Sequence, residues 1–201
     1  MSSPEYIFKN QGMSIIEFKK IFFWEYFHRL WGRLIGIVFI IPLIIFYLFN
    51  KIPNSILLKL FTILFLGSLQ AIIGWWMVKS GLVNDPTVSQ YRLAVHLFNA
   101  LLILFLLIWT LLEFKNGHSK IKLDFSFIIF CFLFTTIIAG AFVAGMDAGL
   151  MYNEYPLMGY SFIPENYGEN GFLDPFENPA SAQFHHRHIA LFTTICVLIY
   201  C

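Results

Sequence analysis

The chain has 201 residues, of which 58% are hydrophobic, 19% are aromatic and only 12% are charged, and its formal net charge at pH 7 is +1. Together with a mean hydropathy of +0.71, this composition leaves too little polar surface for a water-soluble globule, so we expect a membrane protein. The sequence also lacks a basic patch with interleaved aromatic residues, which argues against a nucleic-acid partner.

Apolar segments follow one another along the chain. A helix needs about 20 apolar residues to cross a bilayer, and the sequence predicts such spans at roughly 24–49, 56–78, 91–113 and 125–146. A fifth apolar segment runs from 184 to the last residue, 201, and is too short to complete a span, so we expect the natural chain to continue. The predicted fold is all-α, a polytopic transmembrane helical bundle.

The positive charges of the connections predict which side of the membrane each connection faces. Five lysines flank or fill the two short connections after the first and third spans: Lys51, Lys59, Lys115, Lys120 and Lys122. The long connection at 147–183 carries Asp and Glu but no Lys or Arg. Because basic residues favour the cytoplasmic or matrix side, we expect the lysine-rich connections to face inward and 147–183 to face outward.

One short motif occurs twice, each time at the outer end of an apolar segment. Residues 25–29 read EYFHR and residues 183–187 read QFHHR. Helical residues three apart share a face, so the first copy places a carboxylate beside its histidine and the second a neutral amide. The two copies are therefore related in position but different in chemistry.

Histidines at the membrane edge are the candidate metal ligands. His28, His96 and His186 are expected at the same depth, and the spans of His28 and His96 run in the same direction. Imidazoles from two helices of a bundle can hold a haem iron from both faces, so these two residues form a candidate bis-histidine site. The alternative is that each histidine only makes hydrogen bonds at the interface. On spacing alone His185 or His188 could replace His186, which is favoured by the alignment of the two motifs.

Three arginines are candidate partners for the haem propionates. Arg29 and Arg187 directly follow the motif histidines, and Arg33 lies one turn beyond Arg29. Guanidinium groups pair bidentately with carboxylates, so these residues suit a porphyrin better than a bare metal ion. The alternative is that they extend toward the lipid headgroups.

Glu25 is the candidate catalytic residue. A carboxylate one turn from an iron ligand can transfer protons or stabilise a developing positive charge. Its replacement by Gln183 in the second copy suggests that only the first site needs a titratable group. The alternative is a solvated residue at a helix start, where a negative side chain is mildly favourable.

These residues, together with further motifs, resemble the haem A synthase family, in the branch found in alphaproteobacteria and mitochondria. The resemblance covers nearly the whole chain and rests on jointly specific stretches, namely residues 25–33, 74–82, 92–96, 143–150, 152–156 and 183–187. The outer connections also lack the cysteine pair of other branches of that family.

The resemblance implies eight spans in a pseudo-symmetric pair of four-helix bundles. Residues 1–123 would then form the N-terminal half without its first span. Residues 124–201 would form the start of the C-terminal half, including the outer connection 147–183. The chain is thus expected to be truncated at both ends relative to the family.

The resemblance further implies an oxidoreductase that converts a methyl group of haem O into the formyl group of haem A, for cytochrome oxidase. It assigns His28 and His96 to the iron of the substrate haem and Glu25 to catalysis beside it. It assigns His186 to a haem b in the C-terminal half, whose second ligand would lie in a later span.

The resemblance also implies a cellular setting. We expect a multi-pass protein of the bacterial inner membrane, or alternatively of the mitochondrial inner membrane, with haem O synthase and an electron donor as partners. A competing interpretation is a non-catalytic bis-histidine cytochrome for electron transfer, which would use the same histidines and arginines but would not need Glu25.

Overall fold

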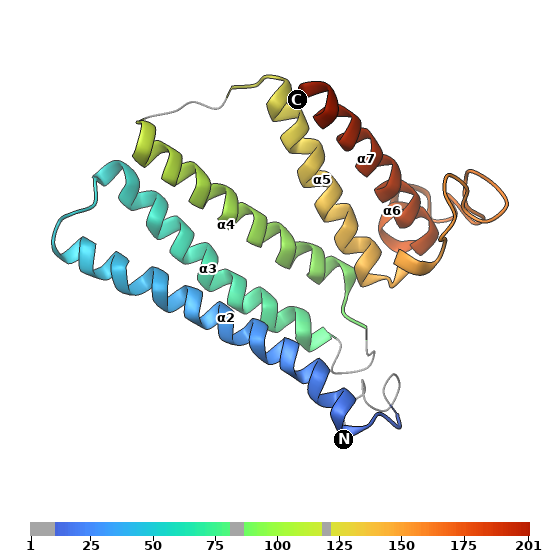
Figure 1. Cartoon of the computed structure of the whole chain (residues 1–201), viewed down its shortest axis with the longest axis horizontal. Helices are drawn as coiled ribbons and strands as arrows, with labels where there is room; N and C mark the ends of the chain where they lie inside the picture. Colours follow the sequence, from blue (N-terminus) through green and yellow to red (C-terminus); the bar gives the residue numbers. More distant parts are fainter. Residues whose placement is uncertain (1–10, 81–86, 118–121) are drawn as a thin grey trace. The chain divides into compact units, whose positions relative to one another are not determined.

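The computed structural model describes residues 11–80, 87–117 and 122–201, and it confirms an all-α fold, without any β-strand in these ranges. Four of the described helices are long and apolar enough to cross a membrane. They are α2 (Ile15–Leu48), α3 (Asn54–Ser80), α4 (Gln90–Asn116) and α5 (Phe125–Gly145) (Figure 1). The protein is therefore a multi-pass membrane protein.

Large apolar side chains cover much of the surface of these helices. In α2, Leu43 is the residue that is buried, whereas side chains such as Ile35 and Val38 are well exposed. In water this surface would be unfavourable by about 25 cal/mol per Å² of apolar area. Apolar surface of this kind suits a bilayer, as the sequence composition predicts.

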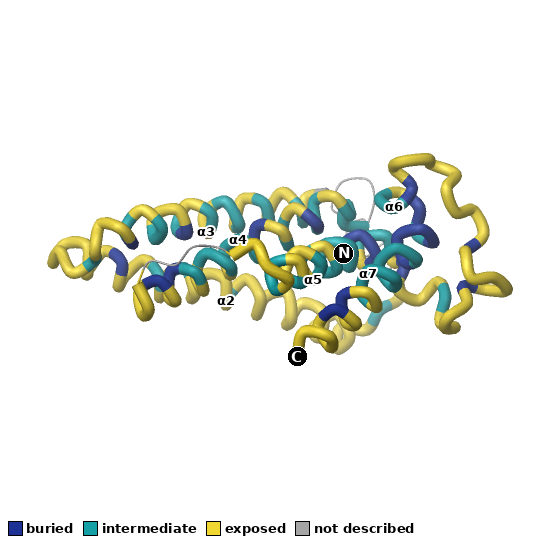
Figure 2. The backbone as a smooth tube through the Cα atoms, turned by 90° about the horizontal axis from the view of Figure 1, so that it is seen from above, coloured by how far each residue is buried: buried dark blue, intermediate teal, exposed yellow. Residues whose placement is uncertain are grey.

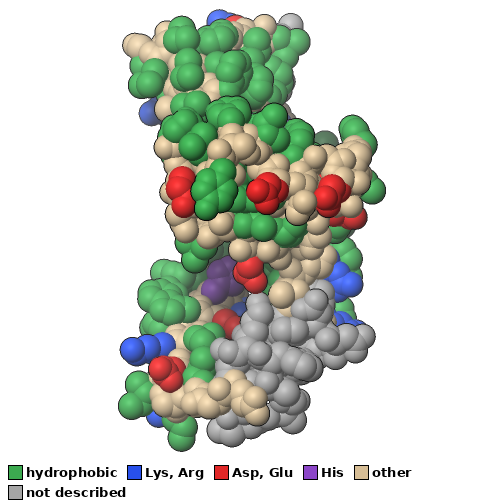
Figure 3. Space-filling model, turned by 90° about the vertical axis from the view of Figure 1, so that its right-hand side faces the viewer, with side chains coloured by type: hydrophobic (Ala, Val, Ile, Leu, Met, Phe, Trp, Pro, Cys, Tyr) green, Lys and Arg blue, Asp and Glu red, His purple; other side chains and the backbone are tan. Residues whose placement is uncertain are grey.

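The outer segment, which we define as residues 147–178, connects α5 to the last helix. It contains two short 3-10 helices, η1 (Ala148–Leu150) and η2 (Gly171–Leu173), and one turn of α-helix, α6 (Asp174–Glu177). The last helix is α7 (Pro179–Tyr200). On the face that carries the outer segment, acidic side chains alternate with large hydrophobic ones (Figure 3).

Helix α2 begins earlier than the apolar pattern suggests. Ser14 caps it, because the Ser14 hydroxyl accepts a hydrogen bond from the Glu17 N–H and the Glu17 carboxylate accepts one from the Ser14 N–H. This capping box satisfies amide donors that would otherwise have no partner. The helix starts at Ile15, so Glu25 lies in its interior rather than at a helix start.

The helices form two compact units, which we describe separately. The first consists of Met1–Pro86 and Asn99–Ser119, and the second of Thr87–Phe98 and Lys120–Cys201. In the first unit, the rings of Tyr47 on α2 and Phe61 on α3 meet edge to face with centroids 5.9 Å apart. Polar side chains link α3 to the later part of α4, as described below.

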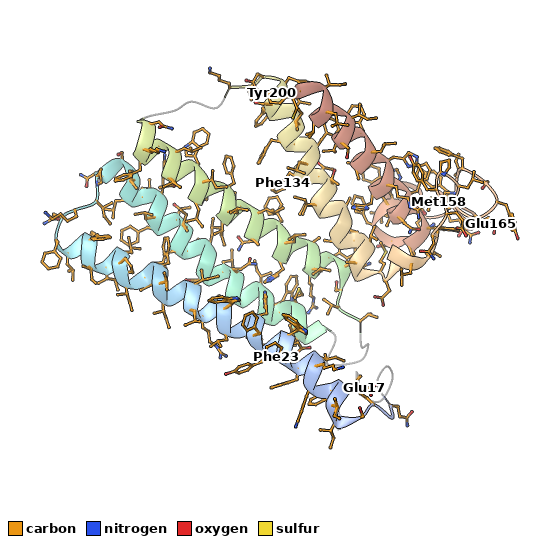
Figure 4. The ribbon with its side chains drawn as sticks, in the orientation of Figure 1. Glu17, Phe23, Phe134, Met158, Glu165 and Tyr200 are labelled. Atoms are coloured by element: carbon orange, nitrogen blue, oxygen red, sulfur yellow. The ribbon has the colours of Figure 1, made fainter. Side chains whose placement is uncertain are left out.

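In the second unit, α5 packs against the first turns of α4. Ala94 forms a buried apolar cluster with Ala141 and Phe142, and the ring centroids of Phe98 and Phe134 lie 5.3 Å apart. Phe134 is labelled on α5 in Figure 4. A Cβ atom at Gly145 would lie 2.5 Å from the Gln90 Cα atom. Only glycine allows the two backbones to approach this closely.

Helix α5 also packs along α7. The hydroxyls of Thr136 and Thr193 are 2.9 Å apart, and Val143 shares a buried cluster with Ala182 and Ala148. Residues later in α5 thus meet residues earlier in α7, so the two helices are antiparallel. The first turns of α7 are the most continuously buried part of the unit (Figure 2).

Candidate functional site

The first copy of the motif lies on an exposed face of α2. His28, Arg29 and Arg33 are all exposed, and Arg29 Nη2 donates a hydrogen bond of 3.1 Å to Glu25 Oε2. The side chains of this ion pair are 55% and 50% exposed, so its contribution to stability is small, about 0–1 kcal/mol. The carboxylate therefore has a defined cationic neighbour on its own helix while remaining accessible.

His96 lies on α4, partly buried, with its Nδ1 atom in the interior. One turn further along, buried Asn99 donates hydrogen bonds to the Leu66 carbonyl (3.0 Å) and to Gln70 Oε1 (2.7 Å). These bonds fix the later part of α4 against α3 within the first unit. His28 belongs to the first unit and His96 to the second, so their joint ligation of one iron stays a prediction.

In the second copy of the motif, Gln183 is almost fully buried, at 4% exposure. Its amide nitrogen donates to the carbonyls of Gly149 (3.1 Å) and Tyr152 (3.0 Å), and its amide oxygen accepts from the Tyr152 N–H (3.2 Å). Both hydrogens of the side-chain amide therefore take part in hydrogen bonds. Gln183 thereby attaches the outer segment to the start of α7.

This arrangement gives a structural reason for the difference between Glu25 and Gln183. An ionised glutamate can only accept hydrogen bonds, so at position 183 it would face two carbonyl oxygens in a buried site. The second copy needs an amide to hold the outer segment. The difference between the copies therefore does not by itself show that Glu25 must titrate.

Arg187 binds the same stretch of the outer segment. Its Nη1 donates to the Glu154 carbonyl at 2.9 Å, and its Nη2 donates to the Tyr152 carbonyl. A guanidinium has five donor hydrogens, so these two contacts leave others available. Binding of a haem propionate by Arg187 stays a prediction.

The three histidines of the second copy have different surroundings. His185 Nε2 lies 3.1 Å from the Tyr167 hydroxyl of the outer segment. His188 Nδ1 lies 2.7 Å from the Phe184 carbonyl, and its ring packs between Phe162 and Phe184. The His186 ring instead turns its Nε2 edge toward α5, at Gly140.

A buried carboxylate that sequence reasoning missed lies just before α7. Asp174 is 2% exposed and accepts hydrogen bonds from the Gly168 N–H (2.8 Å), the Asn170 N–H (3.1 Å) and the Asn178 amide (3.1 Å). Burial opposes ionisation, but these donors and the nearby Ser181 hydroxyl outweigh it and lower the pKa of Asp174 to about 2. The group is ionised at neutral pH.

Asn178 joins this carboxylate to the helix. Its side-chain oxygen accepts from the Ala180 N–H (3.0 Å), and its nitrogen also donates to the Asn166 carbonyl (2.7 Å). An asparagine followed by proline at the first helical position is a recognisable helix start. The cap was thus readable from the sequence, whereas its contact with Asp174 was not.

Two further contacts between polar side chains of α3 and α4 were not predicted from the sequence. Lys59 on α3 forms an ion pair with Glu113 on α4, and the Glu113 side chain is only 5% exposed. The other pair is Asn99 with Gln70, described above. Polar residues inside apolar spans are expensive unless they are paired, and this signal could have identified both pairs.

The candidate histidines and arginines suit haem better than a bare metal ion. Across the part of the chain that the structure describes, no group of three or more His, Cys, Asp or Glu side chains comes together as a metal site. A haem supplies four of its iron's ligands itself and takes one or two axial side chains from the protein. Separate histidines with neighbouring arginines fit that requirement.

Comparison with known proteins gives a consistent result. The "Heme A synthase" of Wolbachia pipientis wMel is 44% identical over 98% of this chain and 59% of its own length. The proteins of the same name from Parvibaculum lavamentivorans and Rickettsia felis are 42% and 40% identical, over 97% and 98% of this chain and 58% and 62% of their own lengths.

The chain therefore spans about three fifths of the length of these relatives. No solved structure matches it. The family model described as COX15-CtaA, cytochrome oxidase assembly protein, matches residues 1–201. With a match over its full length, this chain belongs to the COX15-CtaA family of cytochrome oxidase assembly proteins.

Proposed function

We propose that the protein is a haem A synthase, an oxidoreductase that converts haem O into haem A for cytochrome oxidase. The observation that carries this proposal is the identity of 40–44% to proteins named "Heme A synthase" over 97–98% of the chain. The two histidine motifs at 25–29 and 183–187 lie within the matched stretch.

The proposed reaction converts one porphyrin methyl group into a formyl group. A first hydroxylation replaces a C–H bond by C–OH, a second gives a geminal diol, and loss of water leaves the aldehyde. A hydroxylation by dioxygen places one oxygen atom on the carbon and reduces the other to water with two electrons and two protons. An electron donor is therefore an expected partner, with haem O synthase as the expected source of the substrate.

In the N-terminal half, we assign His28 and His96 as axial ligands of the substrate iron, and Arg29 and Arg33 to its propionates. Glu25 would accept or donate protons at the porphyrin edge. The exposed Glu25–Arg29 pair supports this assignment, because the arginine orients an accessible carboxylate one turn from His28.

In the C-terminal half, we assign His186 to the iron of a haem b, which would supply electron transfer when bound, and Arg187 to a propionate. The alignment of His186-Arg187 with His28-Arg29 supports His186 over His185 and His188.

We further propose the bacterial inner membrane as the location, in keeping with the bacterial sources of the relatives. The outer segment and the Glu25 end of α2 would face the extracytoplasmic side. A mitochondrial inner membrane is the alternative location.

Pigment extraction from the purified protein tests the proposed function. A synthase should contain haem O or haem A in addition to haem B when it is produced in cells that make haem O. Haem B alone would favour the electron-transfer cytochrome and contradict the proposal.

The ligand assignment has a separate test. Replacing His28 or His96 by alanine should abolish low-spin bis-histidine absorption at the substrate site, because iron needs both axial imidazoles for that spectrum. An unchanged spectrum in both variants would show that these histidines have a structural role only.

A further inference from the structure

Helix α2 carries two shallow hollows on its surface. The first, which we call the basic hollow, has a volume of about 330 Å³ and is lined by Ile16, Lys19, Lys20, Phe23 and Trp24. The second, the apolar hollow, has a volume of about 360 Å³ and is lined by Trp31, Leu34, Ile35, Val38 and Phe39. Within each set the residues are spaced by three and four, so each set lies on one face of the helix.

The two hollows share the same face of α2, one below the other. Five helical turns take about 18 residues, so Leu34 lies directly below Ile16, and Val38 directly below Lys20. The Glu25–Arg29 pair is not on this face. Arg29 comes about two and a half turns after Lys20, which places it on the opposite side of the helix. The hollows are therefore separate from the candidate catalytic carboxylate.

Aromatic rings connect the two hollows. Phe23, which is labelled in Figure 4, stacks on Phe27 with ring centroids 5.8 Å apart. Phe27 in turn meets Trp31 edge to face, with centroids 5.7 Å apart. Phe23 belongs to the basic hollow and Trp31 to the apolar one. An apolar track thus runs from one hollow to the other.

The length of α2 places the hollows at different depths of a bilayer. From Lys20 to Leu48, the end of the helix, the rise is about 42 Å. A bilayer is about 40–45 Å thick with its headgroups, so Lys20 lies at the level of the headgroups. Ile35, in the apolar hollow, lies about 22 Å from Lys20, close to the bilayer midplane.

The basic hollow has the chemistry of an anion site at the membrane surface. Lys19 and Lys20 are both exposed, and each ammonium offers three donor hydrogens. The nearby Glu17 carboxylate accepts hydrogen bonds from the Ser14 N–H and hydroxyl, so it is held at the helix start. Trp24 supplies the amphipathic ring that is typical of the membrane interface.

We propose that this face of α2 binds an anionic phospholipid. Its phosphate lies at Lys19 and Lys20 in the basic hollow, and an acyl chain follows the aromatic track to the apolar hollow. Clusters of basic residues at the membrane surface bind anionic headgroups in this way. The inference does not depend on the proposed enzymatic function.

Native mass spectrometry of the purified protein tests the preference for an anionic lipid. Phosphatidylglycerol and phosphatidylcholine both contain a phosphate and can carry the same acyl chains, but only phosphatidylglycerol has a net negative charge. We expect phosphatidylglycerol to stay bound under conditions that remove phosphatidylcholine. Equal retention of the two lipids, or retention of neither, would overturn the inference.

Lysine variants test the basic hollow. Lys19→Gln and Lys20→Gln should each lower the affinity for phosphatidylglycerol about 5-fold, and together about 30-fold. Lys79→Gln is the matched control, because Lys79 is an exposed lysine next to a ring, 5.0 Å from the Trp75 centroid, but lines neither hollow. It should bind the lipid like wild type. A loss as large as that of Lys20→Gln would reduce the effect to general surface charge and contradict the site.

A change in the apolar hollow tests the position of the acyl chain. Val38 is 71% exposed, so Val38→Trp should fill the hollow without disturbing the fold. This variant should weaken binding of long-chain phosphatidylglycerol but not of a short-chain form, which does not reach the hollow. Equal binding of the long-chain lipid by variant and wild type would contradict the proposed path of the chain.

Two other anions are distinguished by the same variants. Glycerol 3-phosphate, which lacks acyl chains, should not displace the lipid, and displacement would show a site for free phosphate instead. The haem content of the Lys19→Gln/Lys20→Gln variant should equal that of wild type. Loss of haem with unchanged lipid binding would assign the two lysines to the porphyrin propionates and overturn the inference.

Discussion

At the scale of single residues, the two copies of the motif differ in their first side chain, which is a carboxylate in one and an amide in the other. Glu25 is exposed and paired with Arg29, whereas Gln183 is buried and makes three hydrogen bonds to the outer segment. The same position of the motif therefore carries an accessible ion pair in the first copy and a buried attachment of the outer segment in the second.

Gln183→Glu should destabilise the protein. A carboxylate cannot donate to the Gly149 and Tyr152 carbonyls, and leaving such buried groups unsatisfied costs about 1–3 kcal/mol. Thermal unfolding in detergent and protease sensitivity of the outer segment would measure the effect. Gln183→Leu is the control for the charge: it leaves the same carbonyls unsatisfied but does not place a negative charge against their oxygens, so it should destabilise less than Gln183→Glu. A glutamate variant as stable as wild type would contradict this account.

Glu25→Gln should leave haem binding intact and halt turnover. Removing a group that transfers protons in the rate-limiting step typically lowers the rate by about 10²–10⁴-fold, whereas loss of the exposed Glu25–Arg29 pair should hardly change stability. The measurement is the haem A content of cells that make haem O, with a haem spectrum as the binding control. Wild-type amounts of haem A would remove Glu25 from the mechanism.

At the scale of elements, the outer segment and α7 form one bonded structure. Asp174 and Asn178 connect the 166–170 turn to the helix start, and Gln183 with Arg187 binds the stretch around Tyr152. These contacts surround the turn of α7 that carries His186. The outer segment is thus positioned by the same helix that presents the candidate ligand.

Asp174 should make this structure acid-sensitive. Its pKa in the folded protein is about 2, below the ordinary value of 3.8, so the folded state favours the ionised form. The stabilisation is complete above pH 3.8 and is lost as the pH falls toward 2, and it amounts to roughly 2–3 kcal/mol.

Melting temperatures of wild type and Asp174→Asn between pH 6 and pH 2.5 would measure this contribution. Wild type should be more stable at pH 6, and the difference should shrink as the pH falls. Glu165→Gln, at an exposed residue of the outer segment (Figure 4), is the control and should show no such trend. A difference that does not depend on pH would contradict the assigned role of the charge.

At the scale of the whole molecule, the lysine distribution predicts opposite locations for the outer segment and the connection after α4. Single cysteines at Asn170 and Asn116, in a background with Cys131, Cys196 and Cys201 replaced by serine, would report on the two sides. A membrane-impermeant thiol reagent should label position 170 in intact cells and position 116 only after lysis. Labelling of both positions in intact cells would refute the topology.

The sequence determined the fold class and the positions of the four spanning helices, because apolar length and helical periodicity are local properties of the chain. It also identified the paired motifs at 25–29 and 183–187. It placed the start of α2 too late, since the capping box at Ser14 lies in a polar stretch outside the apolar pattern.

Only the tertiary structure showed which polar groups are in contact. Burial of Asp174, the pair of Lys59 with Glu113, and the approach of His186 to Gly140 join residues on different elements. Such contacts depend on how helices pack, which periodicity does not specify. Gln183 is an example. From the sequence, we interpreted the amide as a sign that the second site needs no titratable group. The structure shows instead that the amide nitrogen donates two buried hydrogen bonds, which a carboxylate could not do.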